Sequence, residues 1–197
     1  IEELARSKGA EFHYGAEVAA IDASRGAVTG VTLADGTTLT AGTVLFNGDP
    51  RALATGLLGD GPAHVAPQTK AAARSLSAEV WAFAATPEGP ELAHHNVFFR
   101  DDPRPEFDAL REGGLVPDPT IYVCAMDRGL PSAPPKLERF ETIANAPPLP
   151  GSRAQEESPP CPQRTFQMLQ RFGLSFTPEP ADSALSTPET FAKAFPA

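Results

Sequence analysis

The sequence predicts an α+β protein: a β-meander with a strand, turn and helix, followed by a second, mostly antiparallel sheet with helices. Residues 11–47 alternate short apolar runs with turns, and Asp35-Gly36 between two of these runs is a strong hairpin signal. Gly, Ala and Pro dominate residues 59–74, which indicates a linker. Further β-type runs and capped helical segments follow it. Sheets and helices are therefore expected in two successive parts.

The first part begins with residues 1–6, which have the pattern of the last turns of an amphipathic helix. Because the chain starts without Met and inside this pattern, we expect an internal piece of a longer protein. Strands are expected at residues 17–21, 27–33 and 37–39. Asp35-Gly36 joins the last two, and it predicts a type I′ turn because both central residues of that turn need positive φ.

A strand, a tight turn and a helix are expected next. Residues 43–46 form a short apolar run that predicts a strand. A polar turn at residues 47–49 follows at once. Asp49 is placed to cap a helix over residues 51–58, with Pro50 at its first position.

The second part contains four β-type runs, at residues 75–85, 93–99, 120–125 and 139–145. They predict an antiparallel sheet that is separate from the meander. A helix is expected at residues 105–111, in one of the connections between these strands.

Two more helices are expected near the C-terminus. Residues 165–172 carry apolar side chains at helical spacing, and Gly173 stands where a helix usually ends. Thr187 is placed to cap a last helix over residues 189–194.

Composition and charge exclude several classes of partner. The 197 residues carry a formal net charge of −9, so nucleic acid is not an expected partner. The same charge argues against docking on anionic lipid through a polybasic patch, but it leaves hydrophobic contact with a bilayer open. The longest apolar run, residues 80–85, is far shorter than the about 20 residues that cross a bilayer.

Neither a metal site nor a disulfide framework is expected. Cys124 and Cys161 have no Cys or His around them at metal-ligand spacing. His94 and His95 are adjacent, and neighbours on a strand point to opposite faces, so their rings are not expected to converge on one ion. This cysteine usage favours a reducing, cytosolic side.

No catalytic or phosphate-binding motif is present. The sequence contains no G-x-G-x-x-G, no P-loop pattern and no nucleophile elbow. Trp81, Phe83, Val97 and Phe99 lie in aromatic and β-branched runs, which fit either an ordinary sheet core or an apolar ligand surface. The residues alone predict an α+β globular domain and no particular activity.

Several segments nevertheless resemble a known family. Residues 14–21, 30–36 and 44–50 resemble a part of the flavin amine oxidase and phytoene desaturase superfamily, the part in which the chain returns to the FAD domain. Four later segments resemble one branch of the carotenoid desaturases, the bacterial hydroxyneurosporene desaturases, which are 1-hydroxycarotenoid 3,4-desaturases. These segments are residues 94–99, 121–128, 145–149 and 171–176. The resemblance covers nearly the whole chain. The sequence departs from it at the Pro-rich residues 158–162, where the relatives have a continuous helix start.

The resemblance implies a fragment of a two-domain FAD-dependent oxidoreductase. Residues 1–60 would belong to the FAD-binding domain and residues 61–186 to an antiparallel-sheet substrate domain with helices. Residues 187–197 would then return toward the FAD domain.

The resemblance also assigns residues to the cofactor and the substrate. The backbone of Val18, first in a V-x-x-I pattern, would meet the adenine of FAD, and Asn47, Gly48 and Asp49 would lie in the turn at the edge of the cofactor domain. The substrate-binding residues would be Trp81, Phe83, Val97 and Phe99, along an apolar channel. No residue is assigned a catalytic role, and no metal is implied.

The implied activity is desaturation of a carotenoid, expected to be a hydroxylated acyclic one such as hydroxyneurosporene, with hydride transfer to the flavin. Other superfamily members, such as a phytoene desaturase, a carotenoid isomerase or an amine oxidase, stay open, as does a non-catalytic β-rich binding module. Because carotenoids reside in membranes, peripheral membrane contact on the cytoplasmic side is expected.

Overall fold

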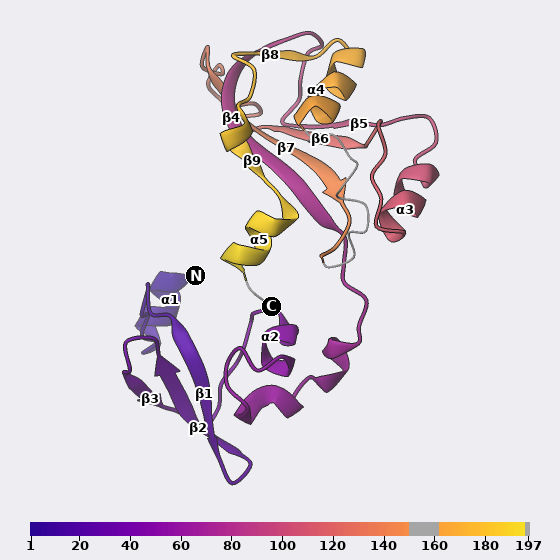
Figure 1. Cartoon of the computed structure of the whole chain (residues 1–197). Helices are drawn as coiled ribbons and strands as arrows, with labels where there is room; N and C mark the ends of the chain where they lie inside the picture. Colours follow the sequence, from indigo (N-terminus) through magenta and orange to yellow (C-terminus); the bar gives the residue numbers. More distant parts are fainter. Residues whose placement is uncertain (150–161, 196–197) are drawn as a thin grey trace. The chain divides into compact units, whose positions relative to one another are not determined.

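The structure is a computed structural model that describes residues 1–149 and 162–195. The chain forms two compact units, which meet in sequence between Ala72 and Ala73, inside the stretch predicted as a linker (Figure 1). Each unit has its own antiparallel sheet, one of three strands and one of six. The α+β class and the separation of the two sheets are therefore confirmed. The assignment of residues 1–60, 61–186 and 187–197 to named domains stays a prediction.

The first unit contains the predicted β-meander. A short helix, α1 (Glu2–Ser7), precedes three antiparallel strands in the order β1-β2-β3. The strands are β1 (Val18–Ser24), β2 (Ala27–Leu33) and β3 (Thr38–Thr40).

The two hairpins of the meander use different turns, and the prediction of the turn type at Asp35-Gly36 is wrong. Gly36 has φ of 87° and donates its N–H to the Leu33 carbonyl at 3.0 Å, which closes a three-residue loop with one left-handed residue. The two-residue turn with positive φ at both positions joins β1 to β2, at Arg25 (φ 54°) and Gly26 (φ 79°). An Asp-Gly pair serves either loop, so the dipeptide alone did not decide between them.

The strand predicted at residues 43–46 is absent. After β3 the Ala41 N–H still bonds to the Thr29 carbonyl at 3.1 Å, and the chain then leaves the sheet. An apolar run becomes a strand only where a neighbouring strand accepts its backbone hydrogen bonds, and none lies there in the first unit. The capped helix does form, as α2 (Pro50–Ala54), with the Asp49 carboxylate accepting the Arg51 N–H at 2.9 Å.

The Gly- and Pro-rich stretch after α2 is partly ordered into two 3₁₀ turns, η1 (Gly61–His64) and η2 (Pro67–Lys70). The Arg51 guanidinium donates to the carbonyls of Thr69 and Lys70 at 3.2 Å each, which ties η2 to α2. Much of the predicted linker therefore packs as part of the first unit.

The second unit is built on a six-stranded antiparallel sheet, in the order β5-β6-β7-β4-β8 with β9 also paired to β4. All four predicted strands are confirmed, and two short strands, β8 and β9, were not predicted. The strands are β4 (Ser77–Glu88), β5 (His95–Phe98), β6 (Ile121–Ala125), β7 (Glu138–Ala146), β8 (Ser175–Thr177) and β9 (Leu185–Ser186).

The predicted helices of this unit are also present: α3 (Arg104–Arg111), α4 (Pro162–Arg171) and α5 (Pro188–Ala194), with a 3₁₀ turn η3 (Asp182–Ala184) before β9. Gly173, with φ of 78°, follows α4, and the Thr187 hydroxyl caps α5 by accepting the Thr190 N–H at 3.3 Å. Residues 158–161, where the sequence departs from its relatives, lie outside the described residues. No helix in the described part of the chain is long and apolar enough to span a bilayer.

One face of the six-stranded sheet carries the core. Strand alternation directs Trp81 of β4, Phe140 of β7 and Val123 of β6 to this face, and each is at most 1% exposed. Helix α4 covers it with Met168 and Leu169 (Figure 1).

The connection from β6 to β7 is held by two ion pairs. The Asp127 carboxylate accepts the Arg139 backbone N–H at 2.7 Å and pairs with the Arg139 guanidinium at 2.6 Å. Next to it, Arg128 binds Glu138 through two hydrogen bonds of 2.7 and 2.9 Å. The hydrogen bonds from Arg139 hold the pKa of Asp127 below its usual range.

The substitution Asp127→Asn is expected to lower the melting temperature at pH 7, because it removes the charge that pairs with Arg139. A depressed carboxylate pKa contributes stability that is present above its unfolded value and lost as pH falls through the folded one. The difference between wild type and variant should therefore shrink below about pH 4. Thermal unfolding followed by circular dichroism from pH 7 to pH 3 measures this, with Asp101→Asn in an exposed turn as the control. A difference that does not change with pH would contradict the ion-pair account.

Candidate functional site

Val18, the predicted adenine contact, is the first residue of β1. It pairs with Leu33, and a β-bulge separates this pair from the next one at Ala20. Its side chain is 38% exposed, whereas Ile21, the last residue of the same pattern, is buried. A cavity of about 380 Å³ lies beside the pair, lined by residues 13–17 and 33–35. Bulges re-aim the chain and are common next to binding sites, which suits a backbone contact here.

Asn47, Gly48 and Asp49 form an exposed turn before α2. Two of these residues already have local structural roles. The Asp49 carboxylate caps α2, and a Cβ on Gly48 would meet the tip of the Phe46 ring, so a larger residue there would require that ring to move. Contact of this turn with FAD stays a prediction.

Trp81 and Phe83 belong to the core face of the large sheet. Trp81 is fully buried, and its ring meets Phe166 of α4 edge-on with centroids 5.5 Å apart. Phe83 packs among Phe140 at 5.6 Å and Phe176 at 5.0 Å. Both residues are thus part of an aromatic cluster under α4.

Val97 and Phe99 lie elsewhere. Val97 is 53% exposed and Phe99, just after β5, is 59% exposed. The strand register places Val97 in line with Tyr122, Ile143 and Val80, on the face opposite to Trp81. The structure therefore does not bring the four predicted substrate residues together, although which of them contacts a substrate stays a prediction.

The face opposite to the core, which we call the open face, is formed by two rows of side chains across four strands. The first, apolar row consists of Val80, Ile143, Tyr122 and Val97. The second row begins at Ala82 and is otherwise formed by the polar residues Glu141, Cys124 and His95, so we call it the polar row. All but Cys124 are at least partly exposed. Of this surface, sequence reasoning found only Val97, because on β4 it chose the bulky residues, whereas the less bulky alternate residues form the open face.

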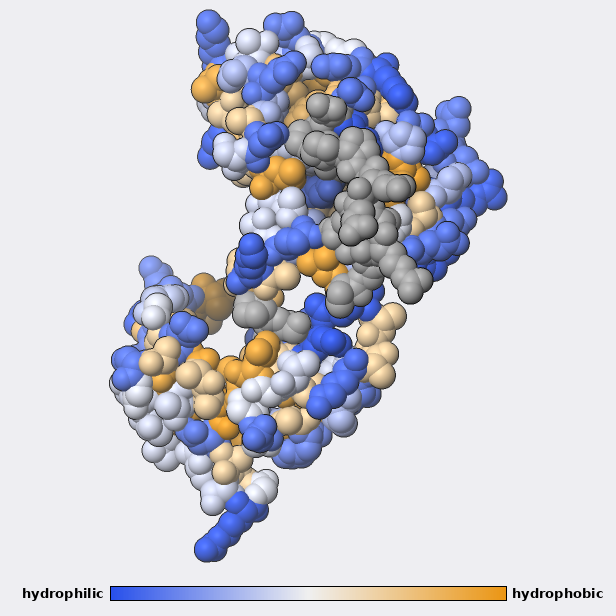
Figure 2. All heavy atoms as spheres, viewed as in Figure 1, coloured by the Kyte–Doolittle hydropathy of each residue, from blue (hydrophilic) through white to orange (hydrophobic). Residues whose placement is uncertain are grey.

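Other structural features surround these surfaces. At one end of the open face, the buried Glu106 of α3 accepts hydrogen bonds from Asn145 at 3.2 Å and from the Thr120 hydroxyl at 2.7 Å. Figure 2 shows apolar side chains reaching the surface of both units among hydrophilic ones.

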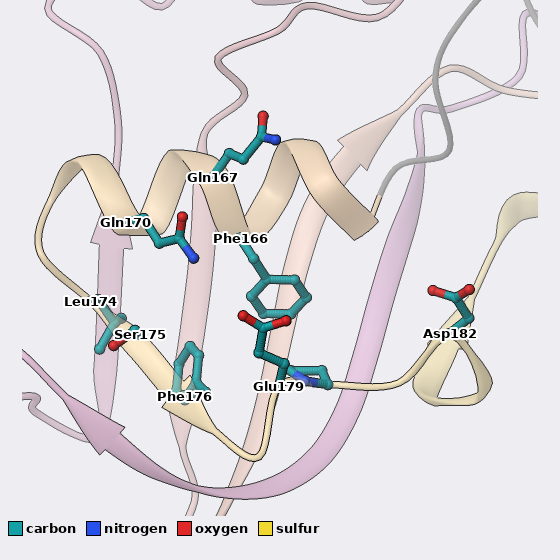
Figure 3. Close-up of a pocket in the computed structure, with 9 residues that line it drawn as sticks. Phe166, Gln167, Gln170, Leu174, Ser175, Phe176, Glu179 and Asp182 are labelled. Atoms are coloured by element: carbon teal, nitrogen blue, oxygen red, sulfur yellow. The ribbon is translucent and has the colours of Figure 1, made fainter.

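A second cavity, of about 360 Å³, lies on the core side between α4 and β8. Figure 3 shows Phe166 pointing from α4 toward the segment after β8, where Glu179 lies beside it. Glutamines of α4 and the carboxylate of Asp182 also line it. Its mixed polar and apolar lining suits a long apolar ligand less well than the apolar row does.

The prediction that strand alternation keeps the rings of His94 and His95 on opposite faces is wrong. Their centroids lie 4.3 Å apart, nearly perpendicular at 86°. Strand alternation holds only within a regular strand, and β5 begins at His95, so His94 is free of that constraint. Cys124 lies opposite His95, with its Sγ 3.7 Å from Nε2 of His94.

Tyr122 joins this group, since its hydroxyl lies 2.7 Å from Nδ1 of His95. Desolvation raises the pKa of the Tyr122 phenol, and a hydrogen bond with Cys124 and the charge of Glu141 raise it further. The phenol is therefore neutral and available as a hydrogen-bond partner at neutral pH.

Comparison with known proteins identifies close relatives. A hydroxyneurosporene desaturase of Cereibacter sphaeroides is 49% identical over 195 residues, which cover 98% of this chain and 39% of that protein. A hydroxyneurosporene desaturase of Rhodobacter capsulatus is 45% identical, with the same coverage of both chains. A 1-hydroxycarotenoid 3,4-desaturase of a Flavobacterium is 33% identical over 74% of this chain and 30% of that protein. No protein-family model matches the chain.

Substitutions can distinguish the two faces of the large sheet. Trp81→Ala should lower the free energy of unfolding by about 3 to 5 kcal/mol, because it empties a fully buried site. Val97→Ala should change it by no more than about 0.5 kcal/mol, because that side chain is half exposed. Urea denaturation of the 197-residue chain measures both. Equal losses at the two positions would mean that the open face is buried in solution.

Proposed function

The chain belongs to the carotenoid desaturase family, and from this we propose that it forms part of a FAD-dependent enzyme that desaturates a hydroxylated acyclic carotenoid. The observation that carries the proposal is 49% identity to a hydroxyneurosporene desaturase across 98% of the chain. The chain spans 39% of the length of that relative, so the activity proposed is that of a whole protein of this type.

The residues present fit one part of a FAD site. Val18 stands at a bulge beside a cavity of about 380 Å³, which supports an adenine contact through the backbone. Pyrophosphate is usually held by a Gly-rich turn at a helix N-terminus, and the 197 residues contain no G-x-G-x-x-G. The first unit would therefore contribute to the adenine end, and residues 47–49 would lie at its edge.

We assign the carotenoid to the open face of the second unit. Its apolar row crosses four strands, which at the usual strand spacing span about 14 Å, and a polyene can lie along such a row. Val80, Ile143 and Val97 would exclude water from it, and the Tyr122 hydroxyl would offer one polar contact for an oxygenated end. Trp81 and Phe83 would support the sheet from beneath.

A bound flavin would supply the two-electron acceptor, so that a carbon pair next to the polyene would lose one hydrogen as a hydride to the flavin and the other as a proton released to solvent. The protein then needs to orient an apolar substrate and keep water away, and no nucleophile or carboxylate pair is required. The apolar row would supply one wall of such a site. Because such a substrate resides in a bilayer, we also propose peripheral membrane contact on the cytoplasmic side.

The proposal is tested in a chimera in which residues 1–197 replace the aligned segment of the Cereibacter relative. Expressed in a host that accumulates hydroxyneurosporene, the chimera should convert it to a product with one further double bond, seen by liquid chromatography and absorption spectra. Val97→Asp should reduce this conversion at least tenfold at equal protein and flavin content, because it places a charge in the apolar row. Phe107→Asp, on an exposed position of α3, is the matched control.

Two results would overturn the proposal. Conversion of phytoene without conversion of hydroxyneurosporene would assign the chain to a different substrate within the family. A folded, flavin-containing chimera that converts neither would exclude desaturation by this chain.

The 197-residue chain alone is expected to bind FAD at best weakly. It would lack the charge-assisted hydrogen bonds to the pyrophosphate, each contributing roughly 1.5 to 3 kcal/mol. Titration followed by flavin fluorescence should show no saturation at micromolar FAD. Saturable binding that Val18→Pro does not weaken would mean that the chain holds the cofactor through other residues.

A further inference from the structure

Within residues 1–149 and 162–195, the strongest unassigned cluster lies at the β5–β6 edge of the open face. One ring nitrogen each of His94 and His95 and the Sγ of Cys124 all lie within 4.8 Å of one another. Among the described residues, this group combines donors that Zn²⁺ prefers, two imidazoles and a thiol.

The spacing of the donors matches a tetrahedral ion. Zn–S and Zn–N bonds of about 2.3 and 2.05 Å place the two ligand atoms about 3.6 Å apart at a tetrahedral angle. Cys124 Sγ and His94 Nε2 are 3.7 Å apart. Small rotations of the exposed His95 ring can bring its nitrogen to the corresponding distance, because the register already places it directly across from Cys124.

The His94 ring is held in the tautomer that a metal requires. Its Nδ1 lies 2.7 Å from the Arg128 carbonyl, which can only accept, so Nδ1 carries the proton and the lone pair of Nε2 faces Cys124. Arg128 is itself fixed, because its guanidinium binds Glu138 and donates to the Leu92 carbonyl at 3.0 Å. Gly129 follows with φ of 75°, a backbone conformation that favours glycine, and packs beside His94.

The His95 ring has a comparable partner. The Tyr122 hydroxyl lies 2.7 Å from its Nδ1, and in the tautomer where Nδ1 donates to this oxygen, Nε2 has its lone pair free. Glu141 is the register partner of Cys124 on β7 and adds a negative charge on the same face. Outer hydrogen bonds and nearby negative charge of this kind are typical of metal-ligand histidines.

We propose that His94, His95 and Cys124 bind a zinc-class transition-metal ion with a fourth position open to water. Soft thiolate and imidazole donors select such an ion over Mg²⁺ or Ca²⁺, which take oxygen ligands. His95 is exposed, so the ion has a path from solvent. The bound ion would join the start of the edge strand β5 to β6. This proposal does not rest on the desaturase assignment.

Cobalt titration of the reduced, metal-free 197-residue chain tests the site. Co²⁺ should bind one per chain, with visible bands of tetrahedral coordination and a thiolate-to-cobalt charge-transfer band, and Zn²⁺ should displace it. Cys124→Ser should abolish the charge-transfer band. His94→Gln and His95→Gln should each weaken binding at least tenfold, since loss of a residue that merely supports a metal ligand already costs about 10- to 100-fold.

Matched variants provide the controls. Cys161→Ser, at the other cysteine, and His13→Gln, an exposed histidine of the first unit, should leave both the band and the affinity unchanged. If the Cys124→Ser variant does not fold, the metal affinity of His95→Gln decides the question, because His95 is exposed. A charge-transfer band that survives Cys124→Ser, or an affinity that His95→Gln leaves unchanged, would overturn the proposal and leave the cluster as a hydrogen-bonded part of the sheet.

Discussion

Burial of one face of the six-stranded sheet beneath α4 is the constraint on which the second unit depends. The helix has ten residues and covers the sheet with Phe166, Met168 and Leu169. The aromatic side chains below it interlock, with Phe140 and Phe176 centroids 4.9 Å apart. This packing also buries the Trp81 indole N–H and the Thr142 hydroxyl, which have no hydrogen-bond partner among the described residues. Leaving each of these groups unsatisfied costs about 1 to 3 kcal/mol of folding free energy.

Because β6, β7 and β4 present alternate residues to two sides, covering one face leaves the other available for binding. The open face combines an apolar row, suited to a polyene, with a polar row that ends in Cys124 and His95. The ion pairs of Asp127 and Arg128 fix the turn whose carbonyl orients His94. Packing, turn geometry and the candidate metal ligands are therefore linked at one edge of the sheet.

Local signals in the sequence predicted local structure well. Asp49, Thr187 and Gly173 stand at helix ends, where their side chains or backbone satisfy groups that the helix cannot. Signals that depend on distant neighbours were less reliable. The apolar run at residues 43–46 has no partner strand in the first unit, and the short strands β8 and β9 form only because β4 is long enough to pair with both.

The sequence by itself determined the α+β class, the meander, four strands of the large sheet and the resemblance to carotenoid desaturases, because these depend on periodicity, capping residues and residue patterns within single segments. Tertiary structure decided which residues share a face. Trp81 and Val97 are both apolar strand residues, but the register across β4, β7, β6 and β5 places them on opposite sides. It also decided that His94, His95 and Cys124 meet, because strand pairing joins residues 30 positions apart and the chain before β5 is free of the alternation that sequence reasoning assumed.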